Sequence, residues 1–226
     1  MGVLDTAARI VELGGSAARA QRVAAMRAAY ELRTGAFSPA DAWFDERSGA
    51  FWCDAVTAGR FGREVEAELS EGERAHLGPL ERAHRGLFRA VEVEGADGDV
   101  LVDAWSGAEL LLTATDEASR QELAASAGQL FDARVVGTDE PYEVALLPGA
   151  VFHARDASEA IPAVLAAARV RGMGADDTLD ALLRMERTLR SLSRVKAAYA
   201  YRAEALSPNA PAVPHRTVRR TNKAPT

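Results

Sequence analysis

The chain has 226 residues, of which 48% are hydrophobic and 27% are charged, and its formal net charge at pH 7 is −6. That composition is typical of a globular protein. No run of about 18 apolar residues occurs, so we expect no membrane-spanning helix, and the start of the chain does not resemble a secretory signal. The single cysteine, Cys53, excludes an internal disulfide. We therefore expect a soluble, cytoplasmic protein.

The charge is unevenly distributed along the chain. Residues 86–154 carry 13 Asp and Glu against 3 Arg, a net charge of −10. Residues 169–226 carry 12 Lys and Arg against 5 acidic residues, a net charge of +7. Such an asymmetry does not specify a fold, but it indicates that the two parts attract each other or charged partners.

The N-terminal region contains helical patterns and an aromatic-rich segment. Residues 3–13 and 17–33 place apolar side chains at helical spacing, and glycines separate the two predicted helices. Residues 36–60 carry five large aromatic side chains, and we expect an irregular segment that packs between the helices and the rest of the protein. A short acidic helix is predicted from Phe61, where apolar residues recur every fourth position.

The middle of the chain is the only region whose sequence is typical of β-structure. Short runs rich in valine, leucine and aromatic residues are separated by turn signals such as Asp97-Gly98 and Ser106-Gly107. A polar segment after the third run begins with residues that can cap a helix, Thr115 or Asp116. The predicted strands are residues 87–94, 100–105, 109–114, 130–136 and 142–147.

Three strands, a helix and two strands form an order of elements that resembles the OB fold, a five-stranded barrel with a helix after its third strand. An SH3-like barrel with an inserted helix is the alternative. The expected fold class is α+β: a small five-stranded OB-like or SH3-like β-barrel, flanked by N-terminal helices and a long C-terminal helix. We expect a helical N-terminal region at 1–80, the barrel at 81–155, C-terminal helices at 156–206 and a basic disordered tail at 207–226.

The C-terminal region should contain a helix to about Arg171 and then one long helix from about Asp176 to Leu206. The second helix carries an apolar stripe spaced by threes and fours, which must be buried against the N-terminal helices or against a second copy of the chain. Residues of this stripe that we expect at such an interface are Leu182, Met185, Leu189, Leu192 and Tyr199.

The tail at residues 207–226 has four prolines and no acidic residue, so we expect it to stay disordered. Its charge is suited to an acidic surface, because opposite charges steer association. The basic side chains that would bind such a surface are Arg216, Arg219, Arg220 and Lys223.

One motif suggests a ligand. Arg85 and Arg89 have an R-x-x-x-R spacing just before the predicted barrel, and Asp103, Ser106 and Gly107 follow in the order D-x-x-S-G. The pair resembles the cyclic di-GMP-binding PilZ domain, whose motifs are R-x-x-x-R and D/N-x-S-x-x-G, although the second motif differs here. The resemblance implies that the two arginines clamp phosphates. The alternative is a hairpin turn beside two surface arginines.

We expect no enzyme, no metal and no cofactor. The four histidines lack the spacing of metal ligands, and the chain has no P-loop or nucleophile elbow. The sequence predicts a non-enzymatic interaction or adaptor protein that binds another protein or an acidic surface. The alternatives are a nucleic-acid-binding protein that uses the basic C-terminal region, and a PilZ-like cyclic di-GMP sensor. A homodimer is a further alternative for the partner.

Overall fold

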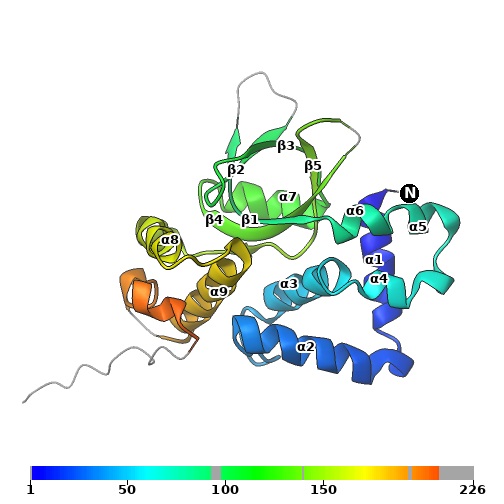
Figure 1. Cartoon of the computed structure of the whole chain (residues 1–226), viewed down its shortest axis with the longest axis horizontal. Helices are drawn as coiled ribbons and strands as arrows, with labels where there is room; N and C mark the ends of the chain where they lie inside the picture. Colours follow the sequence, from blue (N-terminus) through cyan, green and yellow to red (C-terminus); the bar gives the residue numbers. More distant parts are fainter. Residues whose placement is uncertain (1, 93–97, 139, 193–194, 209–226) are drawn as a thin grey trace, which may run out of the picture.

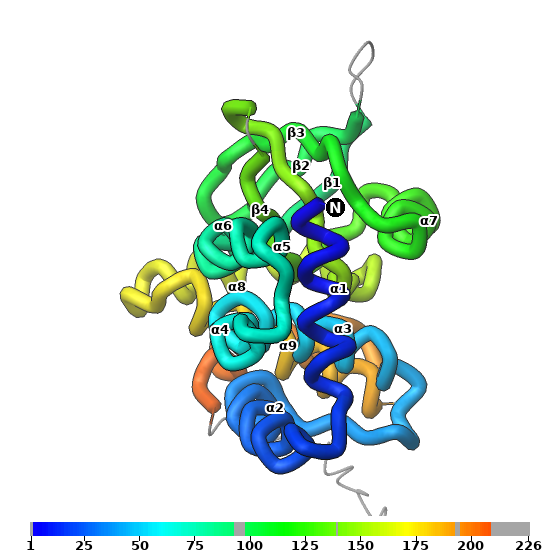
Figure 2. The backbone as a smooth tube through the Cα atoms, turned by 90° about the vertical axis from the view of Figure 1, so that its right-hand side faces the viewer, coloured from blue at the N-terminus to red at the C-terminus, as the bar shows by residue number. Residues whose placement is uncertain are grey.

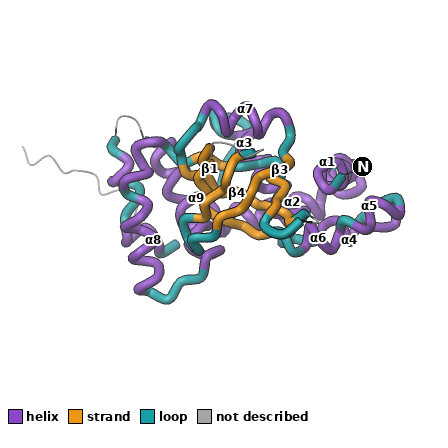
Figure 3. The backbone as a smooth tube through the Cα atoms, turned by 90° about the horizontal axis from the view of Figure 1, so that it is seen from above, coloured by secondary structure: helices purple, strands orange, loops and turns teal. Residues whose placement is uncertain are grey.

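The computed structural model describes residues 2–92, 98–138, 140–192 and 195–208. A β-barrel lies at one end of the molecule, and most of the helices gather below it in the view of Figure 1. Seen from above, the strands lie between α8 and α9 on one side and α1, α4, α5 and α6 on the other (Figure 3). Within the described residues, no helix has the length and apolar character needed to cross a membrane.

The barrel confirms the predicted fold class. Its five strands are hydrogen-bonded in the order β1-β2-β3-β5-β4, and β4 closes the barrel by pairing with β1. The β3–β5 pairing is parallel, and helix α7 (Glu117–Ala125) connects β3 to β4, as in the OB-like order of elements. A short sixth strand extends the sheet beyond β4. The strands are β1 (His84–Glu92), β2 (Asp99–Asp103), β3 (Glu109–Ala114), β4 (Leu130–Gly137), β5 (Glu143–Leu146) and β6 (Val151–Phe152).

Alternation along β1 gives the barrel an inner and an outer face, because successive side chains of a strand point to opposite sides. Phe88 lies inside, fully buried, in one cluster with Leu101, Phe131 and Leu146. Leu87 belongs instead to the cluster that joins the barrel to the C-terminal helices. The outer face of β1 is therefore the surface on which the helical part of the molecule packs.

The N-terminal helices differ from the predicted ones after residue 36. The segment expected to be irregular contains helix α3, whose first turn carries two acids that favour a helix N-terminus. Its aromatic residues pack mainly against α2 rather than between the helices and the barrel: Phe51 lies edge-on to Tyr30 at a centroid distance of 5.9 Å. The helices are α1 (Val3–Gly14), α2 (Ala20–Thr34), α3 (Phe44–Val56), α4 (Phe61–Glu64), α5 (Glu71–Ala75) and α6 (Leu77–Glu81). Figure 2 shows α1 running from the barrel toward α2.

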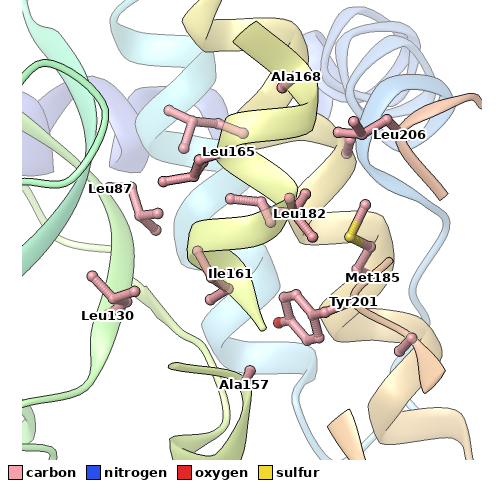
Figure 4. Close-up of a cluster of buried hydrophobic side chains, with 14 of the residues drawn as sticks. Leu87, Leu130, Ala157, Ile161, Leu165, Ala168, Leu182, Met185, Tyr201 and Leu206 are labelled. Atoms are coloured by element: carbon pink, nitrogen blue, oxygen red, sulfur yellow. The ribbon is translucent and has the colours of Figure 1, made fainter. Parts of the chain in front are cut away.

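The predicted C-terminal helix is confirmed at its start, near Asp176, but its predicted extent to Leu206 is wrong. Helix α9 (Ala175–Ser191) ends because Leu192 is extended, with φ −103° and ψ 133°. Two 3₁₀ segments follow at Ala197–Tyr199 and Ala203–Leu206. They turn back and bury apolar side chains in the cluster between α8 (Ile161–Val170) and α9, which a straight helix could not reach (Figure 4). The tail prediction for residues 209–226 lies outside the described part of the chain.

A chain of alternating charges, buried at Arg85, Asp132 and Asp180 and more exposed at Arg33, joins the barrel to three helices. It starts and ends on β4 and passes through β1, α9, α2 and α3, and each consecutive pair of side chains lies within 2.9 Å. Three arginines and three aspartates balance its charge. Its members, in order of contact, are Asp132, Arg85, Asp180, Arg33, Asp54 and Arg134. We call it the barrel–helix ion-pair chain.

The packing of α9 gives a first prediction. Leu182 is 0% exposed in the cluster between α8 and α9, whereas Leu32 on α2 is 84% exposed. Leu182→Ala should lower the free energy of unfolding by about 2–5 kcal/mol, because it leaves a cavity. Leu32→Ala is the matched control and should change it by less than about 0.5 kcal/mol. Urea denaturation measures both, and equal effects would contradict the placement of α9.

Candidate binding groove

A groove of about 350 Å³ lies between the outer face of β1 and β2 and helix α8. Leu130 on the barrel and Ile161 and Leu165 on α8 face each other across this boundary (Figure 4). We call this feature the α8 groove. Its lining residues are Arg89, Val91, Val102, Ala104, Leu130, Ile161, Pro162, Leu165 and Arg169.

Arg89 reaches the groove because of its register in the barrel. It shares the outer face of β1 with Leu87, and it lies opposite Val102 on β2 and Leu130 on β4. Its side chain is exposed and lines the groove. The structure thus places one of the two motif arginines at a concave surface.

Arg169 supplies a second positive charge from the opposite wall. It follows Ala168, the last buried residue on the inner face of α8. Its guanidinium lies over the indole ring of Trp105 at 4.9 Å from the centroid and donates to the Trp105 carbonyl oxygen at 2.6 Å. Neither Arg89 nor Arg169 forms an ion pair with any residue that the structure describes. Two guanidiniums without an ion-pair partner among the described residues therefore flank the groove, although that of Arg169 already donates to the Ala104 and Trp105 carbonyl oxygens.

Asp103 organises the turn that presents Trp105. It is 1% exposed, and its carboxylate accepts hydrogen bonds from the Trp105 amide at 3.0 Å and from the Ser106 hydroxyl at 2.5 Å. The left-handed φ of 78° at Gly107 completes the turn into β3. Burial by itself raises the pKa of Asp103, but the bonds from His84, Ser106 and Trp105 outweigh it and lower the pKa to about 2. The D-x-x-S-G motif thus forms a hairpin turn.

Arg85, the other motif arginine, is not on the surface. It is 8% exposed, and its guanidinium donates to both carboxylate oxygens of Asp132 and to Asp180 on α9 at 2.7 Å. Burial alone lowers the pKa of Arg85, but the two aspartates raise it well above its usual range, so the group stays charged. Its donors are occupied within the protein, and the pair Arg85 and Arg89 does not form a joint phosphate clamp.

The residues predicted at an interface lie in different environments. Leu182 and Met185 are 0% and 1% exposed and belong to the core, and Leu189 packs against the same cluster. Leu192 lies just after the end of α9, and Tyr199, 52% exposed, lies in a 3₁₀ segment. These five side chains do not form one continuous surface. The four basic tail residues, Arg216, Arg219, Arg220 and Lys223, lie outside the described residues.

The arginines of α9 are used within the protein. Arg184 donates to the carbonyl oxygens of Arg33 and Leu206, and Arg187 donates to that of Ala36. Arg190 pairs with Glu46 at 2.5 Å and with Glu186 at 2.6 Å. Much of the positive charge of the C-terminal region therefore stabilises the end of α2 and its connection to α3.

Other side chains that could act as acids, bases or nucleophiles are also buried. His153 is 0% exposed, and its Nδ1 lies 2.7 Å from the hydroxyl of Tyr201, which donates to Glu186. Burial raises the pKa of the Cys53 thiol to about 12, so this thiol is not an activated nucleophile. No group of three or more His, Cys, Asp or Glu that could hold a metal occurs among the described residues.

Comparison with known proteins adds no further information on the groove. No protein-family model, no curated protein and no solved structure matches this chain.

The Asp103 turn gives a pH-dependent prediction. The pKa of this carboxyl is about 2 in the folded protein, below its ordinary value of 3.8. The lowered value contributes stability that is present above pH 3.8 and is lost as the pH falls toward 2. Asp103→Asn should therefore lower the free energy of unfolding by about 1–2 kcal/mol at neutral pH. The difference in the free energy of unfolding between this variant and wild type should shrink in acid.

Urea denaturation at neutral pH and at several acid pH values measures this difference. Asp45→Asn, at an exposed position in the first turn of α3, is the control for loss of one carboxylate. The free energies of unfolding of Asp103→Asn and wild type could instead differ by the same amount at neutral and at acid pH. That result would show that the carboxylate does not stabilise the turn through its charge.

Proposed function

We propose that the protein is a non-enzymatic binding module whose α8 groove docks an acidic, partly apolar segment of another protein. The observation that carries the proposal is the pair of guanidiniums, Arg89 and Arg169, on opposite sides of an apolar groove without ion-pair partners among the described residues. A guanidinium binds a carboxylate through two parallel hydrogen bonds, which gives both affinity and orientation.

The apolar lining determines the rest of the partner. Leu130 and Leu165 form the buried floor of the groove, and its accessible apolar lining is Val91, Val102 and Pro162. These side chains offer no hydrogen bond, so the partner must bring apolar side chains to contact them. A short peptide segment can combine leucine-like side chains with one or two carboxylates at the rim. Arginine and large apolar groups together are typical of the centre of protein–protein interfaces.

The groups at the groove also favour binding over catalysis. A guanidinium remains protonated at all physiological pH values, so neither Arg89 nor Arg169 is a general base or a nucleophile. Both are suited to orienting an anion. The side chains with acid–base potential, such as His153 and Glu186, are buried elsewhere and bonded to one another through Tyr201.

The two alternatives have less support. A nucleic acid would approach a barrel region with a net charge of −10, which repels phosphates, and Arg184, Arg187 and Arg190 of α9 already bind groups within the protein. A cyclic dinucleotide of the PilZ type would need Arg85, whose guanidinium is held by Asp132 and Asp180. A protein segment with one or two carboxylates is repelled less than a nucleic acid, and it does not need Arg85.

The test uses the full chain and a displayed library of random peptides. Selection should enrich peptides that combine acidic and large apolar residues. Binding of an enriched synthetic peptide, measured by fluorescence anisotropy, should weaken about tenfold or more in Arg89→Glu, because a charge-assisted bond is replaced by repulsion. The affinity of the wild-type protein should also fall as salt concentration rises.

Arg120→Glu is the matched control. It makes the same charge reversal on α7, where Arg120 is exposed and pairs with Glu117, and it should leave peptide affinity unchanged. If the library enriches nothing, or if Arg89→Glu binds the selected peptide as tightly as wild type, the α8 groove is not the docking site.

A further inference from the structure

A second pocket, separate from the α8 groove, lies between α1, α3 and the segment after β5. Figure 3 shows α1 and α8 on opposite sides of the barrel, so the two sites do not share a wall. The volume of this second pocket is about 290 Å³. The residues that line it come from three distant segments: Ala7, Ala8, Val11, Gly49, Trp52, Cys53, Val56, Leu147 and Pro148.

One wall of the pocket is held in place by Trp52. A Cβ atom built on Gly14 would lie 2.6 Å from the indole ring, closer than any real contact, so the ring already touches the backbone of α1. On its other sides the ring packs against Phe51 and Phe61, at centroid distances of 5.1 Å and 6.3 Å. Trp52 therefore has no room to move toward α1.

The opposite wall is fixed by a contact between two backbones. A Cβ atom on Gly149 would lie 2.3 Å from the Gly49 carbonyl carbon, and Gly149 has a left-handed φ of 100°. The close approach fixes the segment that carries Leu147 and Pro148 against α3. Because both walls are held by close packing, the space between them is a preformed pocket rather than a gap that side-chain movement would close.

The lining is apolar and uncharged. None of the described residues that line the pocket carries a charged side chain. The one ionisable group, the Cys53 thiol, has a pKa raised to about 12 by burial and is neutral at physiological pH. A charged ligand would lose its hydration here without gaining a partner, whereas a hydrocarbon would lose only unfavourable contact with water.

We propose that this pocket binds a small, uncharged, mainly hydrocarbon ligand. Apolar cavities about half this size hold one benzene molecule, so the volume fits a ligand of roughly ten carbon atoms. The site is independent of the α8 groove and of the partner proposed for it. It makes the protein a candidate for binding a short aliphatic or aromatic molecule beside α1.

The test is calorimetric titration of the full chain with octanol and, as the charged counterpart, octanoate at neutral pH. Octanol should bind at one site with a negative heat-capacity change, the mark of apolar burial. Octanoate should bind at least about tenfold more weakly, because its carboxylate finds no partner.

Ala8→Phe places a ring at the exposed mouth of the pocket and should abolish octanol binding. Ala24→Phe is the control, since Ala24 is an exposed alanine on α2 outside the pocket. Thermal melts establish that both variants are folded. If octanol does not bind the native chain, or binds Ala8→Phe equally well, the proposal is wrong. If the native chain is instead a dimer that Ala8→Phe separates, the pocket is an interface between copies and the proposal is likewise overturned.

Discussion

Arg85 lies on the outer face of β1, and its guanidinium joins Asp132 on the neighbouring strand to Asp180 on α9. The rest of the barrel–helix ion-pair chain continues from Asp180 through α2 and α3 back to β4. Arg85, Asp132 and Asp180 are buried, and taking their charges out of water is costly unless a closely matched geometry compensates for it. The relative position of barrel and helices is therefore narrowly determined, because any other arrangement leaves a buried charge without its partner.

Both candidate sites follow from that constraint. With α9 fixed over β1, α8 packs against Leu87 in the shared cluster, and Arg89, the next outward residue of β1, emerges beside it at the α8 groove. On the other side, α3 is held by Asp54 and carries Trp52 and Gly49 to the apolar pocket. The barrel–helix ion-pair chain thus positions a candidate binding site on each side of the barrel.

Local sequence patterns predict the barrel well, because strand alternation and turn residues act over a few positions. Local patterns fail where contacts between residues far apart in the sequence determine the structure. The apolar spacing of α9 continues past Ser191, yet burial of Tyr201 and Leu206 in the α8–α9 cluster favours a chain that turns back. Likewise, the R-x-x-x-R motif does not reveal that Asp180, 95 positions beyond Arg85, neutralises it. The pairing of Arg169 with the Trp105 carbonyl spans 64 positions and has no local signal.

The most direct test of the account is a double-mutant cycle on Arg85 and Asp180, in which Arg85→Met, Asp180→Asn and the double variant are compared with wild type by urea denaturation. If this pair joins α9 to the barrel, the two single changes should each destabilise the protein, and their effects should be non-additive by about 1–3 kcal/mol. Additive effects, with a coupling energy near zero, would show that the barrel and helices are held together without this contact.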